Sequence, residues 1–525
     1  MSLNVEAYAL QGVPDFETSI DPETSRCTER RMHPKDGGLV DGLIALLATF
    51  PFLLLISLSG LAGFHWSVIP AMLAGAIMGK DMVALLRGKM DMFDPKGIIG
   101  TLGFLFFFIS HVSHVYNDNV GVAASSNGTA WFGYVAIINL VGSFIYLLGQ
   151  RVGFSGTSRR VQKYWCPPPT VPPFLTILTI LSALAWGLYM IKAGGYEAIA
   201  RSMYQHKYTV RGLGPLALLG DSAPVLLFLG LTLLKGSANW YRKSNAILVL
   251  ILVCAIFIVQ FVITGVTGSR SRIMWAMFSI AGMIHYCWRP IKRVHILYAI
   301  LPLVVFIQAM ALYKEFNVNL FSSLKGASVS DLMGKSSRKF GDILTGDIGR
   351  TDIQAQALYA TTSAPDGYDF RFGSTYLFGP LNTLPGWVWP HTERPYDWSK
   401  GAAGTEIFRG KGSYSPTKRD RPTYAQYGLV GESLMNFGLV GVFPAFMLWG
   451  FFVGRLRRMV SQCQPGDLRL IACLFLTNAA FVALPSDFDN IFDVLLMKAM
   501  VPIVTLYFIS RKVPAMEIEY AAATE

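Results

Sequence analysis

The sequence predicts an all-α polytopic membrane protein of about 12 transmembrane helices, with a large extracytoplasmic loop that contains short helices. Hydrophobic residues make up 52% of the 525 residues and charged residues only 15%, whereas a soluble chain carries about 25% charge. The apolar residues form runs of roughly 16 to 24, the length that a bilayer core requires. Lys and Arg gather in short clusters between these runs, which is typical of loops retained in the cytoplasm.

Each expected membrane-spanning helix corresponds to one apolar run, and each run ends where the next polar connection begins. The twelve runs are Leu39–Gly60, Leu61–Met78, Gly97–Tyr116, Trp131–Gly149, Pro173–Ala193, Pro215–Leu234, Ala246–Thr267, Ile273–Trp288, Val294–Tyr313, Gly438–Val453, Leu468–Leu484 and Ile491–Ile509. Residues 39–313 therefore hold helices one to nine, and residues 428–510 hold helices ten to twelve.

The sidedness of the chain follows from its basic residues. Alternate connections carry Lys and Arg, whereas the short turns Asn117–Ala130 and Pro485–Asn490 carry neither. Two other outer connections, Lys192–Gly214 and Gly265–Arg272, carry basic residues and break this pattern. The positive-inside rule then places the tails 1–38 and 511–525 in the cytoplasm. Because the first tail has no apolar core followed by a cleavage site, we expect no cleaved signal peptide.

A hydrophilic segment of unusual length, 314–427, interrupts the apolar runs on the side opposite the basic loops. It contains aromatic residues beside polar ones, among them Tyr376 and Trp389. Rings of this kind stack on the C–H faces of sugars, although Trp and Tyr also form belts at the membrane interface. Loops held on a rigid scaffold often carry function, so this loop is the expected location of the site.

The net charge of +12 does not indicate nucleic-acid binding, because the basic residues form no single stripe or arm. The six cysteines are also placed away from the outer loops. A disulfide framework is therefore not expected.

Four short blocks follow one another around the long loop and share glycine beside polar or aromatic residues. They are Gly194-Gly-Tyr-Glu with Arg211–Gly214; Thr267-Gly-Ser-Arg270; Phe372–Tyr376 with Pro385, Trp389-Pro390 and Pro395; and Tyr427–Gly441. In this order the chain, from about Gly194 to Gly454, resembles the bacterial O-antigen and exopolysaccharide repeat-unit polymerases (Wzy-like), which form a wider group with the O-antigen ligases. The third block departs from the family, in which a basic residue often follows the proline equivalent to Pro385; here Gly386 follows.

The resemblance implies a membrane glycosyltransferase of the bacterial cytoplasmic (inner) membrane. Such an enzyme transfers an oligosaccharide from undecaprenyl pyrophosphate to the end of another lipid-linked glycan on the outer face. The expected partners are this lipid-linked oligosaccharide, membrane lipids and a chain-length regulator protein. We expect no cofactor and no metal.

A lipid pyrophosphate leaving group favours arginine, whose guanidinium forks onto phosphate oxygens and stays charged. Arg211 and Arg270 are the catalytic candidates, because glycines beside them let the backbone approach closely. Arg272 is a further substrate-binding candidate. The alternative is that these side chains reach out to lipid headgroups.

An acceptor hydroxyl must lose a proton, so a carboxylate or histidine is also expected. Glu432 is the leading candidate, and in a helix Asn436 would lie one turn away on the same face. The alternative role for Glu432 is that of a carboxylate complementing the helix dipole. In the large loop His391 and Arg421 are candidates for substrate binding, and Glu406 is a second candidate base.

Several other ionisable residues admit both a structural and a functional interpretation. His111 and His114 resemble a weak metal pair, and Asp487-Phe-Asp489 resembles a metal-binding D-x-D motif, but neither offers a full ligand set. Asp221, Asp493 and Lys498 are ionisable residues within expected spans and are functional candidates for that reason, although Asp493 and Lys498 could also pair with groups on neighbouring helices.

Two other functions remain open at the level of sequence. A ligase that moves finished polymer onto lipid A or another acceptor would use the same residues. A transporter or flippase of lipid-linked sugars is a different class, and it usually shows repeated helices with matched breaks in two halves. We find no such repeat in the sequence.

Overall fold

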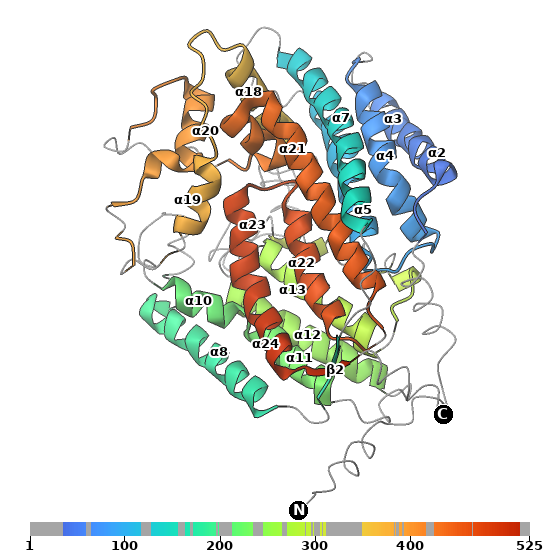
Figure 1. Cartoon of the computed structure of the whole chain (residues 1–525), viewed down its shortest axis with the longest axis vertical. Helices are drawn as coiled ribbons and strands as arrows, with labels where there is room; N and C mark the ends of the chain where they lie inside the picture. The colour runs from blue at the N-terminus through green and yellow to red at the C-terminus, as the bar shows by residue number, and fades with distance from the viewer. Residues whose placement is uncertain are drawn as a thin grey trace, which may run out of the picture.

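In the computed structural model the chain forms a bundle of helices with a small two-stranded sheet at one end (Figure 1). The residues that the structure describes are 35–58, 65–116, 128–155, 163–168, 172–195, 198, 213–234, 245–264, 270–288, 290–295, 298, 305–306, 308–310, 349–382, 384, 388–390, 393–415, 425–464 and 466–514.

The helices follow the order of the predicted runs. Before residue 314 they are α2 (Leu39–Leu47), α3 (Thr49–Leu58), α4 (Val68–Leu86), α5 (Pro95–Phe104), the π-helix η2 (Leu105–Ser110), α6 (His111–Tyr116), α7 (Gly128–Phe154), α8 (Pro173–Lys192), α10 (Gly214–Asp221), α11 (Ala223–Leu234), α12 (Asn245–Thr264), α13 (Arg270–Met283) and the π-helix η5 (Ile284–Trp288). The long hydrophilic segment contains α18 (Thr351–Thr362), α19 (Ser374–Asn382), the 3-10 helix η9 (Tyr396–Trp398) and α20 (Lys400–Arg409). The last elements are α21 (Gly428–Ser461), α22 (Arg469–Val482), α23 (Phe488–Val494), the π-helix η10 (Leu495–Met500) and α24 (Val501–Ile509), and strand β1 (Lys163–Cys166) pairs antiparallel with β2 (Arg511–Pro514).

Among the described residues, eight helices are long and apolar enough to cross a membrane. The prediction of an all-α membrane protein is thereby confirmed, whereas the number of twelve spans is not. α22 has 14 residues and so measures about 21 Å, which is less than the ~30 Å hydrocarbon core. Its apolar sequence reflects burial among the other helices. The expected span Val294–Tyr313 lies mostly outside the described residues.

Basic segments that are far apart in sequence meet at one end of the bundle. Arg457 of α21 forms ion pairs with Asp36, before α2, and with Asp94, before α5. Leu468, between α21 and α22, donates its N–H to the carbonyl of Trp165 in β1. Because β1 pairs with β2, the connection after α24 is held at this end as well.

The described part of the long hydrophilic segment packs at the opposite ends of the same helices. The ring of Tyr359 in α18 meets that of Trp131, near the start of α7, with centroids 5.5 Å apart. Lys400 of α20 reaches Asp487, in the turn between α22 and α23. Figure 1 shows α18, α19 and α20, in orange, gathered near the start of α21. The segment is therefore remote from the basic connections.

The two longest helices, α7 and α21, lie against each other through glycines. α7 carries Gly149 and Gly153, and α21 carries Gly450 and Gly454. A Cβ atom added at any of these four glycines would overlap a backbone carbonyl of the facing helix. Small residues four apart allow membrane helices to approach backbone to backbone, so these glycines set the position of α21 in the bundle.

Replacing Gly450 by Val should therefore force α7 and α21 apart. We expect a loss of about 1–3 kcal/mol, the usual cost of overpacking, visible as a lower melting temperature of the detergent-solubilised protein in size-exclusion chromatography after heating. Gly187→Val in α8 is the control, because nothing lies within 4 Å of a Cβ there. Equal melting temperatures for the two variants would contradict this account of the interface.

Candidate functional site

Glu432 lies in the first turns of α21 and connects three segments of the chain. Its side chain is buried. Oε1 accepts a hydrogen bond from the Thr375 hydroxyl at 2.8 Å, and Oε2 accepts one from the Phe488 N–H at 2.6 Å. One carboxylate thus joins α19, α21 and α23.

Asn436 continues this arrangement one turn later, as the sequence predicted for a helix. Its Nδ2 donates to the Thr375 hydroxyl at 2.7 Å and to the Glu432 carbonyl at 2.8 Å. Its Oδ1 accepts from the Gly373 N–H at 2.9 Å, and its carbonyl accepts from the Phe372 N–H at 3.0 Å. The third and fourth sequence blocks are therefore one hydrogen-bonded unit, which we call the Glu432–Asn436 unit.

The helix that carries this unit is broken at Gly438. Its φ of 63° and ψ of −156° are non-helical values, and the positive φ favours glycine. The apolar run of the tenth span begins at Gly438, whereas the helix α21 already starts at Gly428, where the predicted range 428–510 begins. The first turns are polar in sequence because they carry Glu432, Ser433 and Asn436, and the fold buries all three.

A second charged cluster, the Lys400 clamp (Lys400, Asp487 and Asp489), lies beside the unit. The ammonium of Lys400 donates to Asp487 Oδ2 at 2.8 Å and to Asp489 Oδ1 at 2.9 Å. The other oxygen of Asp487 accepts from the N–H groups of Tyr427 and Gly428, at 2.7 and 2.9 Å. Burial acts to lower the pKa of Lys400, but the carboxylates of Asp487 and then Asp489 outweigh it and raise the pKa above its usual value.

The clamp changes the interpretation of the D-x-D pattern. Asp487 and Asp489 do hold a cation between them, but it is the ammonium of Lys400. Within the described residues no group of three or more His, Cys, Asp or Glu side chains could hold a metal ion. His114 instead lies 3.8 Å from Asp352 of α18, and His111 is buried beside it in α6.

Of the two aromatic candidates, Tyr376 belongs to the Glu432–Asn436 unit. Its hydroxyl lies 3.3 Å from that of Ser433, and its ring packs edge-on against Phe488 with centroids 5.6 Å apart. Burial, and then the nearby Glu432 carboxylate, raise the pKa of Tyr376 well above its ordinary value. The Tyr376 hydroxyl therefore stays protonated and can donate.

Trp389, the second aromatic candidate, is half-buried and held through its backbone. Arg394, which sequence analysis did not single out, donates from Nη2 to the carbonyls of Leu384 at 2.6 Å and Trp389 at 3.1 Å. Its Nη1 donates to the Asn382 carbonyl at 2.7 Å. Arg394 is buried, and its guanidinium holds these three backbone carbonyls of the loop together.

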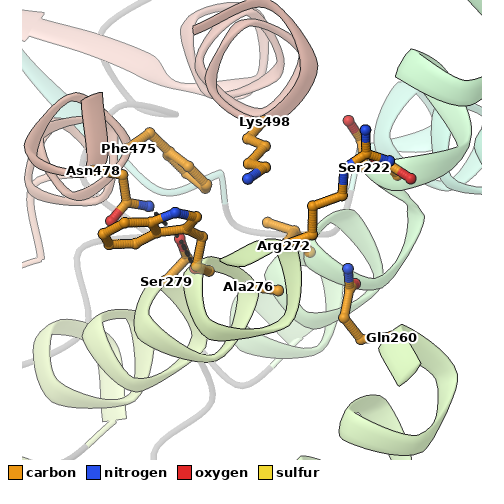
Figure 2. Close-up of a pocket in the computed structure, with 11 residues that line it drawn as sticks. Ser222, Gln260, Arg272, Ala276, Ser279, Phe475, Asn478 and Lys498 are labelled. Atoms are coloured by element: carbon orange, nitrogen blue, oxygen red, sulfur yellow. Dashed lines mark hydrogen bonds and ion pairs between the residues drawn. The ribbon is translucent and has the colours of Figure 1, made fainter. Parts of the chain in front are cut away.

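The intramembrane candidates gather at a separate place. Arg272 forms an ion pair with Asp221 at 3.1 Å, and both line a cavity with Lys498 (Figure 2). Lys498 lies ten residues beyond Phe488 on the last helix, which is about 15 Å along a helix axis. The cavity that Lys498 lines therefore lies further along this helix than the Glu432–Asn436 unit.

Of the remaining catalytic and substrate-binding candidates, the structure describes the side chain of Glu406 only. Glu406 forms an ion pair with Arg371 at 2.6 Å, so its carboxylate is engaged. Arg270 is the first residue of α13, but its side chain is outside the described structure, as are Arg211, His391 and Arg421 entirely. The chain matches no protein-family model, no curated protein and no solved structure.

Lys400→Met should destabilise the junction of α20, α21 and α23. It leaves Asp487 buried without a countercharge, which typically costs about 3–5 kcal/mol. The exposed pair of Lys411 with Asp369 provides the control, and Lys411→Met should change the melting temperature little.

The pH dependence of this effect follows from the pKa values of Lys400 and Asp487. A raised lysine pKa contributes stability below the unfolded value of 10.5, and this stability is lost only as pH rises through the still higher folded value. Burial raises the pKa of Asp487 even with Lys400 in place, so in Lys400→Met this carboxylate takes up a proton more readily as the pH falls. The melting-temperature difference between wild type and Lys400→Met should therefore be largest at about pH 9 and shrink toward about pH 6, and a difference that is absent at about pH 9 would contradict the clamp.

Proposed function

We propose that the chain is a membrane glycosyltransferase that polymerises undecaprenyl-pyrophosphate-linked oligosaccharide repeat units into O-antigen or exopolysaccharide. The observation that carries the proposal is the Glu432–Asn436 unit. Two blocks that resemble this family, Phe372–Tyr376 and Tyr427–Gly441, are far apart in sequence, yet their polar groups bond to one another. A chance likeness of two separate blocks gives no reason for such a contact.

The position of the unit supports the same proposal. It lies at the end of the bundle remote from the basic connections. By the positive-inside rule, that end faces outward from the bacterial cytoplasmic membrane. Lipid-linked oligosaccharides that have crossed the membrane are polymerised on this face.

The proposed reaction requires one new bond and one broken bond. A hydroxyl oxygen of the acceptor glycan attacks the anomeric carbon of the donor, and the bond from that carbon to the pyrophosphate oxygen breaks. The electron pair leaves with undecaprenyl pyrophosphate, whose charge Arg211 and Arg270 stabilise. The acceptor proton passes to Glu432, whose carboxylate keeps free lone pairs while Thr375 and Phe488 fix its orientation.

Other candidates would bind the glycans. Tyr376 offers a protonated hydroxyl beside Glu432, and Trp389 offers a ring in the loop. His391, Arg421 and Arg272 are further substrate-binding candidates, and a chain-length regulator protein is the expected partner. None of these roles requires a metal or cofactor.

Glu432→Gln is the sharpest test of the proton acceptor. Glutamine keeps the size of the side chain and can still accept from the Phe488 N–H, whereas Ala would leave two buried donors unpaired at about 1–3 kcal/mol each. We expect normal protein amounts and melting temperature, but polymer synthesis reduced by about 10²–10⁴-fold. Exposed Glu393→Gln serves as the control, and long polymer in cells carrying only Glu432→Gln would exclude Glu432 as the base.

The glycolipids of a deletion strain test the reaction itself. Loss of a polymerase should leave single repeat units on the lipid carrier, and complementation with Arg211→Ala or Arg270→Ala should give the same profile. Long polymer that accumulates on undecaprenyl pyrophosphate would instead identify a ligase. Mass spectrometry of extracted lipid-linked glycans distinguishes the two.

A further inference from the structure

A polar cavity lies among otherwise apolar helices, further along the last helix than the Glu432–Asn436 unit. α10, α11, α12, α13, α22 and η10 line it (Figure 2), and its volume is about 20 Å³, room for about one water molecule. Its polar residues include Asp221, Gln260, Arg272, Asn478 and Lys498. Ionisable groups at such depth are costly and commonly mark substrate sites.

The backbone is interrupted where the cavity forms. α10 ends at Asp221, and α11 begins at Ala223 with Pro224 in its first turn. Both helices nevertheless belong to one apolar span, Pro215–Leu233. Broken membrane helices place polar backbone and side chains where a substrate binds.

Two cations from different helices contribute to this cavity. Arg272 is held by Asp221 at 3.1 Å. Lys498 extends from η10 into the cavity, as Figure 2 shows, and no described residue lies within ion-pair or hydrogen-bonding distance of its ammonium. Asp493 acts on both cations electrostatically, but without direct contact in the described structure.

Asn478 is an independent indication that the cavity binds something polar. Its side chain is 2% exposed, and its Oδ1 has no hydrogen-bond partner in the described part of the chain. Buried polar atoms are nearly always satisfied. Its Nδ2 donates to the Ser279 hydroxyl at 3.4 Å, and rotating the amide by 180° would exchange this long contact for a donor that faces the cavity. Asn478 can therefore accept from a hydroxyl as it stands, or donate to an anionic oxygen after the rotation.

The size of the cavity excludes a pyrophosphate as long as Arg272 holds Asp221. A pyrophosphate carries several oxygens and would occupy the place of the Asp221 carboxylate on the guanidinium. Displacing the Asp221 carboxylate from the Arg272 guanidinium is favourable only for a ligand that carries more negative charge than this carboxylate. A phosphodiester headgroup, with one charge, gains no such advantage.

We propose that Asp221 is the internal counter-ion of a lipid-pyrophosphate site formed by Arg272 and Lys498, and that it excludes the singly charged phospholipids of the bilayer. The identity of the lipid rests on the proposed function. Phospholipids surround the protein in great excess, so an unpaired Arg272 and Lys498 would bind their headgroups. Asp221 neutralises Arg272 until a pyrophosphate displaces it.

The experiment measures binding of farnesyl pyrophosphate to the full-length protein in nanodiscs, with and without phosphatidylglycerol. The wild type should bind farnesyl pyrophosphate with little effect of phosphatidylglycerol. Asp221→Asn should bind at least about tenfold more tightly, because no internal carboxylate competes, and phosphatidylglycerol should now compete. Asp369→Asn, an exposed carboxylate elsewhere, should behave as wild type.

Lys498→Met keeps the Arg272–Asp221 pair and so tests the site even if Asp221→Asn folds poorly. It should weaken binding of farnesyl pyrophosphate at least about tenfold. Unchanged binding in Lys498→Met, or unchanged or weaker binding in a folded Asp221→Asn, overturns the proposal. Equal binding of inorganic pyrophosphate overturns its lipid part.

The outcomes separate this inference from the proposed function. If the variants bind as expected but a deletion strain makes normal polymer, the anion site stands and the polymerase proposal fails. If Glu432→Gln abolishes polymer while Asp221→Asn and Lys498→Met bind as wild type does, the polymerase stands and the counter-ion role fails.

Discussion

The burial of the Asp487 carboxylate is the constraint on which the rest of this end of the molecule depends. An ionised carboxylate away from water is costly unless donors surround it. Tyr427 and Gly428 supply backbone N–H groups at the start of α21, and Lys400 supplies an ammonium from α20. The start of a helix has such N–H groups to spare and favours negative charge. Asp487 thereby fixes where α21 begins, and with it the position of Glu432.

The large hydrophilic segment is held to the bundle in two physically different ways. α18 buries Ala357 and Leu358 in the same apolar core as helices α7 and α21, a contact that needs no particular partner. α20 buries Ala403 and Ile407 in this core as well. Directional polar contacts add to it, through Thr375 of α19 to Glu432 and through Lys400 of α20 to Asp487. The apolar contact holds the segment on the bundle, and the polar ones determine how it is oriented there.

The sequence predicted the features that depend on local residue types and spacing. It did not predict the contacts that depend on a partner far away in the sequence. Apolar length predicted the membrane helices because the bilayer acts on each run separately. It does not distinguish a span from a short helix that other helices bury, and α22 is short and buried. The one-turn spacing of Glu432 and Asn436 was predicted because it is local. The partner of Asp487 was not, because Lys400 is 87 residues away and no spacing rule connects them. For the same reason Arg272 and Asp221 were singled out separately and never as a pair.

The two charged regions are separate, but the last helix runs through both. α23 begins at Phe488, whose N–H binds Glu432, and the same helix continues into η10, which carries Lys498. A π-helical turn contains an extra residue and recurs at functional sites in helices, and here it lies where Lys498 enters the cavity. Since 488–509 is one continuous apolar span, a displacement of η10 would also move the start of α23. Lys498 and the N–H that binds Glu432 therefore belong to one continuous span, with about 15 Å of helix between Lys498 and Phe488.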